Sequence, residues 1–223
     1  MKGSFFSTRN IAYLAILLAL VIVLQTFGGA INIGAVQLNF TLVPIVLGAI
    51  ILGPLAGAFL GLACGIVVLV QVIMGLVPFY TLIWTGAPVQ TFFTCTVKTT
   101  LAGFLAGLVF KAFRKKNALI GVFVAAAIVP IVNTAVFVLG CITMWNVIAE
   151  MAGGTNVLGF ILVSLVTFNF FIELGVNLLV SPGVYRVVKI FDKSLGRKQA
   201  NSVDYEKGSD SDQIKTDDGN KAE

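Results

Sequence analysis

The chain has 223 residues, of which 58% are hydrophobic and 11% are charged, and its mean hydropathy is +0.99. A soluble domain carries about 25% charged residues, so this composition excludes a soluble globular protein. The apolar runs are long enough for membrane-spanning helices rather than barrel strands. The net charge of +5 is divided unevenly, because residues 1–200 hold 12 Lys and Arg against 3 Asp and Glu, whereas residues 201–223 hold 3 against 7. We attribute the basic part to lipid headgroups and not to nucleic acid.

Six apolar runs are each predicted to form a transmembrane helix, so the expected fold class is an all-α integral membrane protein. In chain order the predicted spans are Ile11–Phe27, Leu38–Leu52, Leu55–Leu76, Val89–Phe110, Ala118–Thr143 and Val157–Val180. Gly53-Pro54 is expected to break the chain between the second and third spans, since proline lacks an amide donor and disfavours helix at the residue before it. In the connection over 77–88, Tyr80 and Trp84 are typical of an interfacial aromatic pair.

The distribution of basic residues predicts that both termini lie in the cytoplasm. The N-terminus, the KAFRKK loop at Lys111–Lys116 and the segment Arg186–Lys198 are basic, whereas the other long connections carry no Lys or Arg. Six spans satisfy the positive-inside rule, and a five-span arrangement with 38–65 as one bent helix would put the KAFRKK loop outside. Residues 1–198 are therefore predicted to form the membrane domain, and the acidic segment 199–223 a disordered cytoplasmic tail.

Lys98 is the only Asp, Glu, Lys or Arg between Asn10 and Phe110. An isolated charge at this depth costs about 2.5–3.5 kcal/mol on insertion scales. Lys98 and Glu173 each lie 13 residues from a cytoplasmic cation, or about 20 Å along a helix, and are therefore expected at the same level. Asn133 and Asn169 each lie 17 residues from such a cation, which predicts a second polar layer about 6 Å further out.

Two interpretations of these polar residues remain open at this point. In the structural one, Lys98 and Glu173 form a salt bridge between packed helices, and the asparagines are interhelical hydrogen-bond partners. In the functional one, polar groups line a substrate path, as intramembrane ionisable residues usually do. Lys98 would then meet an anionic substrate group, with Thr94 on the same helix face, and Glu173 would hold Lys98 or contact a substrate hydroxyl.

Small residues line two of the predicted helices. Four glycines spaced four residues apart lead into the third span and continue along it, which predicts close packing on another helix of the same chain; the four are Gly53, Gly57, Gly61 and Gly65. Ala15 and Ala19 share a face of the first span. They could pack internally or form a docking surface for another membrane protein.

The motif inventory favours binding over catalysis. The chain has no histidine, no P-loop, no G-x-S-x-G motif and no acidic cluster, so we expect no catalytic residue and no metal site. An intramembrane enzyme is thereby disfavoured. Inverted repeats, which a stand-alone secondary carrier would usually show, are also not evident.

The order of these features resembles the substrate-binding S components of energy-coupling factor (ECF) vitamin transporters, over residues 9 to about 190. The matching pieces are Ala15-Ile-Leu-Leu-Ala19, the Gly-Pro passage within Asn39–Gly65, Lys98–Gly103 before a basic loop, and Asn169-Phe-Phe-Ile-Glu173 followed by Asn177 and Ser181-Pro182. The Gly-Pro passage is the most specific of them.

The resemblance implies a subunit without a cofactor or ATPase of its own, which captures a water-soluble vitamin at the outer face of a bacterial plasma membrane. It would work with a transmembrane coupling subunit, docked on Ala15 and Ala19, and with two ATPases that use ATP. The pocket would draw on the first outer loop and spans four to six, with the candidates Asn39, Thr94, Lys98, Asn133, Asn169 and Glu173. The lysine and the Asn-x-x-x-Glu most resemble the pantothenate-type branch. Folate, another vitamin, a queuosine precursor or a stand-alone carrier of a small organic anion stays open.

Overall fold

The computed structural model describes residues 8–28, 32–33, 36–37, 40–114, 116–167 and 169–190. The chain divides into two units, Met1–Tyr185 and Arg186–Glu223, and of the second only the end of the last helix, to Ile190, is described. The candidate Asn39 and the acidic tail predicted after residue 198 lie outside the described residues. Both therefore stay predictions.

Helices make up most of the described chain. In order they are α1 (Thr8–Gly28), α2 (Leu42–Ile51), α3 (Pro54–Ile73), α4 (Pro78–Gly86), α5 (Pro88–Arg114), α6 (Ala118–Thr143), α7 (Trp145–Met151), α8 (Val157–Gly159), the π-helical segment η1 (Phe160–Thr167) and a helix over residues 169–190. Two short strands, β1 (Asn32–Ile33) and β2 (Val36–Gln37), pair antiparallel between α1 and α2. The predicted all-α membrane fold is confirmed.

Among the residues that the structure describes, five helices are long and apolar enough to cross a membrane: α1, α3, α5, α6 and the segment Val157–Ile190. They correspond to five of the six predicted spans. The remaining one contains α2, which has 10 residues and a length of about 15 Å, half of a hydrocarbon core about 30 Å thick. The count of six spans therefore stays a prediction.

The predicted break at Gly53-Pro54 is confirmed. α2 ends at Ile51, and Gly53 adopts φ 106° and ψ 176° before α3 begins at Pro54. A positive φ of this size is open to glycine and strained for other residues. Proline is favoured at the first helical position, where its missing amide hydrogen costs nothing.

The glycines of α3 pack directly on the backbone of α5. A β-carbon at Gly61 would lie 2.6 Å from the carbonyl carbon of Thr99, and one at Gly65 would lie 2.6 Å from the carbonyl oxygen of Cys95. The Thr99 hydroxyl donates a hydrogen bond of 2.6 Å to the Gly61 carbonyl oxygen. The glycine repeat thus serves packing within the chain, as predicted.

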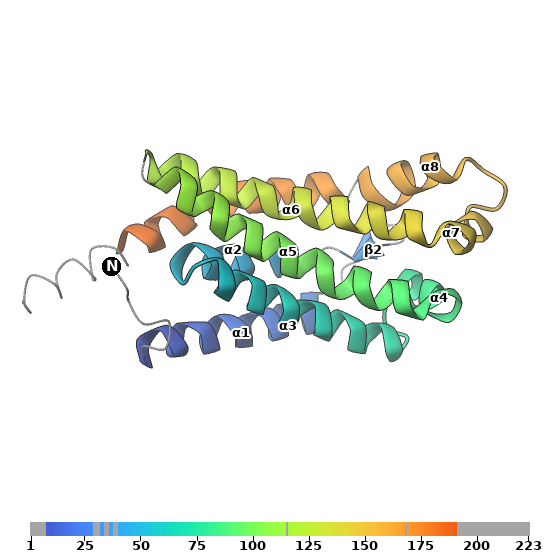
Figure 1. Cartoon of the computed structure of the whole chain (residues 1–223), viewed down its shortest axis with the longest axis horizontal. Helices are drawn as coiled ribbons and strands as arrows, with labels where there is room; N and C mark the ends of the chain where they lie inside the picture. The colour runs from blue at the N-terminus through green and yellow to red at the C-terminus, as the bar shows by residue number, and fades with distance from the viewer. Residues whose placement is uncertain are drawn as a thin grey trace, which may run out of the picture. The chain divides into compact units, whose positions relative to one another are not determined.

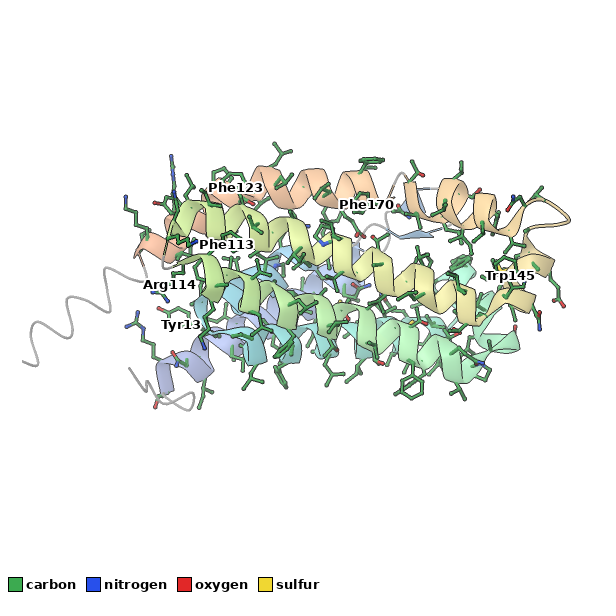
Figure 2. The ribbon with its side chains drawn as sticks, turned by 45° about the horizontal axis from the view of Figure 1, so that its top comes forward. Tyr13, Phe113, Arg114, Phe123, Trp145 and Phe170 are labelled. Carbon is green, nitrogen blue, oxygen red and sulfur yellow. The ribbon has the colours of Figure 1, made fainter. Side chains whose placement is uncertain are left out.

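α5 and α6 run antiparallel, and the turn between them lies at one end of the helices (Figure 1). α4 and α7 contact each other at the opposite end. Tyr13 and Arg114 lie at the end with the turn, and Trp145 lies at the other (Figure 2). The end with the turn is the one that the basic residues assign to the cytoplasm.

Three predicted loop segments are wholly or partly helical. The connection over 77–88 contains α4, and the one over 144–156 contains α7. α5 continues through Lys111 to Arg114, so most of the KAFRKK loop is the last turn of a helix. Basic residues are good helix formers and interact favourably with the helix C-terminus, which explains why α5 continues beyond its last apolar residues.

Candidate functional site

A group of polar side chains is buried between the helices. Each is at most 8% exposed, and the group consists of Thr91, Thr94, Lys98, Asn133, Asn169, Glu173 and Asn177. They come from α5, α6 and the helix over 169–190, and all of them lie within the predicted spans four to six. Burying a polar group among apolar helices costs free energy unless the group is hydrogen-bonded or paired with a charge. Each of these side chains is therefore expected to have a partner or a functional role.

Lys98 is held by two aromatic side chains. Its Nζ donates a hydrogen bond of 2.7 Å to the Oη of Tyr80, and it lies 4.7 Å from the Tyr80 ring centroid and 5.7 Å from that of Phe137. Lys98 is 6% exposed and Tyr80 is 3% exposed. Side chains of an α-helix point toward its N-terminus, which directs Lys98 to the end where α4 lies. A neutral phenol accepts the hydrogen bond without neutralising the charge.

The two rings belong to a cluster of three aromatic side chains. Phe79, Tyr80 and Phe137 meet edge to face, with ring centroids 5.5–6.0 Å apart. Their faces stabilise the ammonium through cation–π attraction, which is stronger where water is excluded. The cluster fixes the position of the charge near the α4 end of the helices.

Tyr80 is a site residue that the sequence argument placed in a connection, as one of an interfacial aromatic pair, and the structure instead buries it in a helix. It lies inside α4, whose buried residues are Phe79, Tyr80 and Ile83. A helix start at Pro78 followed by apolar residues at helical spacing was the available signal. The segment was nevertheless expected to be a connection, because an apolar run this short fits a loop as well as a helix.

Glu173 lies close enough to Lys98 for the two charges to attract each other. The predicted neighbourhood of these two residues is therefore present in the structure. The hydrogen bond that the ammonium donates goes to Tyr80, so a phenol rather than the carboxylate is its hydrogen-bond partner. On the same helix as Glu173, the Asn177 side chain donates to the Glu173 backbone carbonyl at 2.8 Å.

Asn133 does not lie further out than Lys98, and the predicted second layer is wrong for this residue. Two contacts show which residues of α5 and α6 lie at the same height. The Thr91 hydroxyl, at the outer end of α5, donates to the Met144 sulfur at 3.5 Å, and the Lys98 ammonium lies near the Phe137 ring. Moving seven residues inward along α5 therefore corresponds to moving seven residues inward along α6. Asn133 lies four residues from Phe137 toward the α5–α6 turn. That places it about one turn, or roughly 5 Å, to the inner side.

The wrong height for Asn133 arose because the heights of Lys98 and Asn133 were counted from two different lysines. Lys111 lies inside α5, whereas Lys116 lies in the turn before α6 begins. Gly121 packs against the end of α5, where a β-carbon on it would lie 3.2 Å from the Phe110 ring and 3.5 Å from the backbone nitrogen of Arg114, three residues beyond Lys111. Lys111 is therefore level with residues well inside α6 rather than with Lys116, and the two counts did not start at the same height.

Asn133 and Asn169 both carry a buried oxygen without a partner. Among the described residues, neither Oδ1 has a hydrogen-bond partner, and the side chains are 6% and 8% exposed. A buried acceptor without a donor costs about 1–3 kcal/mol. Such atoms are uncommon in folded proteins, so these two oxygens are candidate acceptors for a ligand.

The last span changes its winding just before Asn169. η1 is π-helical, and within it the Thr167 hydroxyl donates to the Leu162 carbonyl five residues back at 2.7 Å. π-helical segments are rare and occur frequently at functional sites. Helical periodicity in the sequence does not reveal such a change of winding.

Thr94, another predicted site residue, packs against α6. Its side chain meets α6 at Gly140, where a β-carbon would clash with it. Its hydroxyl donates to the Gln90 carbonyl of its own helix at 2.8 Å. This position fits a helix contact, and its part in substrate binding stays a prediction.

Within the described part of the chain, no group of three or more His, Cys, Asp or Glu side chains could hold a metal ion. The chemistry offered by the buried polar group is a positive charge, a phenol, a carboxylate and amides. These are groups for binding a small polar molecule through charge and hydrogen bonds.

Fold and site together define a multi-pass helical membrane protein with polar side chains buried between its helices. A family model described as the substrate-specific component of ECF transporters matches residues 9–185, and the chain belongs to this family. A comparison with curated proteins gives no match. Members of the family are transporter subunits rather than enzymes, and they act on a small-molecule substrate with a membrane-embedded energy-coupling module that includes ATPases.

Proposed function

We propose that this subunit captures a water-soluble vitamin carrying a carboxylate, with pantothenate as the best candidate. Capture takes place at the outer face of a bacterial plasma membrane. A transmembrane coupling subunit with two ATPases then receives the vitamin, and ATP is used by those ATPases and not by this chain. The observation that supports the proposal most is the buried Lys98 ammonium.

Lys98 has more hydrogen-bonding capacity than its described neighbours use. An ammonium has three donors, and one of them goes to Tyr80. Desolvation makes a buried ammonium costly on its own. A substrate carboxylate placed against it would satisfy the remaining donors and offset that cost, which favours an anionic ligand over a neutral one.

The amides and the carboxylate suit the other polar groups of pantothenate. The Oδ1 atoms of Asn133 and Asn169 lack donors among the described residues, and pantothenate supplies hydroxyl and amide hydrogens. The Glu173 carboxylate would supply a further acceptor for a substrate hydroxyl. Asn39, at the start of the predicted second span, and Thr94 complete the proposed set of substrate-binding residues.

Docking of the coupling subunit is proposed at Ala15 and Ala19. Both side chains are exposed on α1, so this face is not used for packing within the described chain. Small residues allow close approach of a partner helix in a membrane. With both termini in the cytoplasm, the basic end of the helices faces inward and the α4 end faces outward.

Binding and transport can be tested separately. Purified protein alone is expected to bind pantothenate by isothermal titration calorimetry and to bind pantothenol, its uncharged alcohol analogue, much more weakly. Proteoliposomes with this chain alone should accumulate no pantothenate, whereas those with the coupling module and ATP should. Equal affinity for both compounds would contradict the carboxylate proposal, and uptake by the chain alone would contradict its role as a dependent subunit.

A further inference from the structure

We infer that Tyr80 is a direct ligand of the substrate carboxylate, which it binds together with Lys98, and that α4 thereby sets the preference for an acidic substrate. The inference rests on the proposed function and assigns to Tyr80 a contact that this function alone does not require. No substrate contact was predicted for Tyr80 from the sequence.

The first support is the donor that Tyr80 has left over. Its Oη accepts the hydrogen bond from Lys98 Nζ at 2.7 Å. A phenol has one O–H donor in addition to its acceptor capacity. Among the described residues, no acceptor receives this hydrogen. Lys98 likewise has ammonium hydrogens beyond the one it gives to Tyr80.

The second support is the geometry of the two donor atoms. Nζ and Oη lie side by side at 2.7 Å, and both side chains are more than nine-tenths buried. A carboxylate has two oxygens at a similar separation, so one oxygen can face each donor. Hydrogen bonds to a charged acceptor are shorter and about twice as strong as neutral ones, which favours a carboxylate over an alcohol at this place.

The third support is that the Tyr80 hydroxyl is held in position. Its ring packs edge to face against Phe79 and Phe137 at 5.5 and 5.9 Å. α4 itself is tied to α3, because the Thr81 hydroxyl donates to the Val72 carbonyl at 3.2 Å. A donor fixed in this way loses little entropy when it binds a ligand.

The experiment compares Tyr80→Phe with wild type by calorimetry, using pantothenate, folate, biotin and the uncharged pantothenol as probes. The variant keeps the ring and removes the hydroxyl. It is expected to weaken carboxylate binding about tenfold or more and to leave pantothenol affinity nearly unchanged. Tyr13→Phe, at the other end of the helices (Figure 2), is the matched control and should bind like wild type.

The outcomes separate this inference from the proposed function. If wild type binds pantothenate and Tyr80→Phe binds it equally well, the inference is overturned and the proposed function stands. If wild type prefers folate or biotin and Tyr80→Phe weakens that binding, the pantothenate assignment fails and the inference is supported. If wild type binds only pantothenol among the probes, or none of them, both are overturned.

A second substitution distinguishes a direct ligand from a residue that only holds Lys98. Site-specific incorporation of 3-fluorotyrosine at position 80 makes the phenol a stronger donor and a weaker acceptor. Carboxylate affinity should stay equal or increase if Tyr80 donates to the substrate. A decrease would mean that Tyr80 serves only as the acceptor for Lys98, and would overturn the inference.

Discussion

Replacing Lys98 by methionine removes the charge on which the proposed substrate preference depends. Methionine retains much of the apolar stem, so the packing against Tyr80 and Phe137 is largely kept. The ammonium is 6% exposed and has a phenol 2.7 Å away, so any bond it makes to a substrate carboxylate is largely shielded from water. The variant therefore tests the charge itself.

The expected loss follows from the burial of the charge. Truncating one partner of a buried, hydrogen-bonded charge pair costs about 2–5 kcal/mol in binding. Since each 1.4 kcal/mol is about tenfold in Kd, we expect Lys98→Met to weaken pantothenate binding about 30-fold or more. Pantothenol binding should change much less, because that analogue has no carboxylate to lose.

The assay is calorimetric titration of the purified variant, with Lys111→Met as the matched control. Lys111 is an exposed lysine on the same helix, and its substitution should leave the affinity at the wild-type value. Size-exclusion profiles and thermal unfolding establish that Lys98→Met is folded. A folded Lys98→Met protein whose Kd for pantothenate lies within about threefold of wild type, less than 1 kcal/mol, would refute the reasoning.

Three further predictions concern the amides, the helix packing and the docking surface. Asn133→Leu should weaken pantothenate binding and raise the unfolding midpoint, because it removes a buried acceptor that costs about 1–3 kcal/mol; a lower midpoint would indicate a structural role. Gly61→Val should lower folded yield by forcing α3 from α5, at a cost of about 1–3 kcal/mol or more, whereas Gly175→Ala, with nothing within 4 Å of its β-carbon position, should be tolerated. Ala15→Trp combined with Ala19→Trp should leave calorimetric binding intact and block uptake in proteoliposomes that contain the coupling module; normal uptake would exclude this surface.

The features that the sequence predicted correctly depend on local chemistry. A Gly-Pro pair ends one helix and starts the next whatever surrounds it. A glycine at every fourth position leaves a helix face without side chains, and the α3–α5 contact follows from that. The isolation of Lys98 in an apolar run was visible without a structure, and it identified the residue at the centre of the candidate site.

The features that the sequence could not predict depend on how separate segments meet. The height of Asn133 relative to Lys98 is set by the contact of Phe110 with Gly121 and by the extra turn of α5, which no single helix reveals. Tyr80 reaches Lys98 because α4 folds back on α3 and α5. The winding of η1 depends on backbone hydrogen bonds that side-chain periodicity does not encode.

The central claim is that this subunit binds a vitamin through a carboxylate held at Lys98. Native mass spectrometry of the protein purified in mild detergent, with the ligand it retains, tests the claim most directly. We expect a bound small molecule that carries a carboxylate, with the mass of pantothenate, and its loss in the Lys98→Met protein. A retained ligand without an acidic group, bound equally by the variant, would contradict the claim.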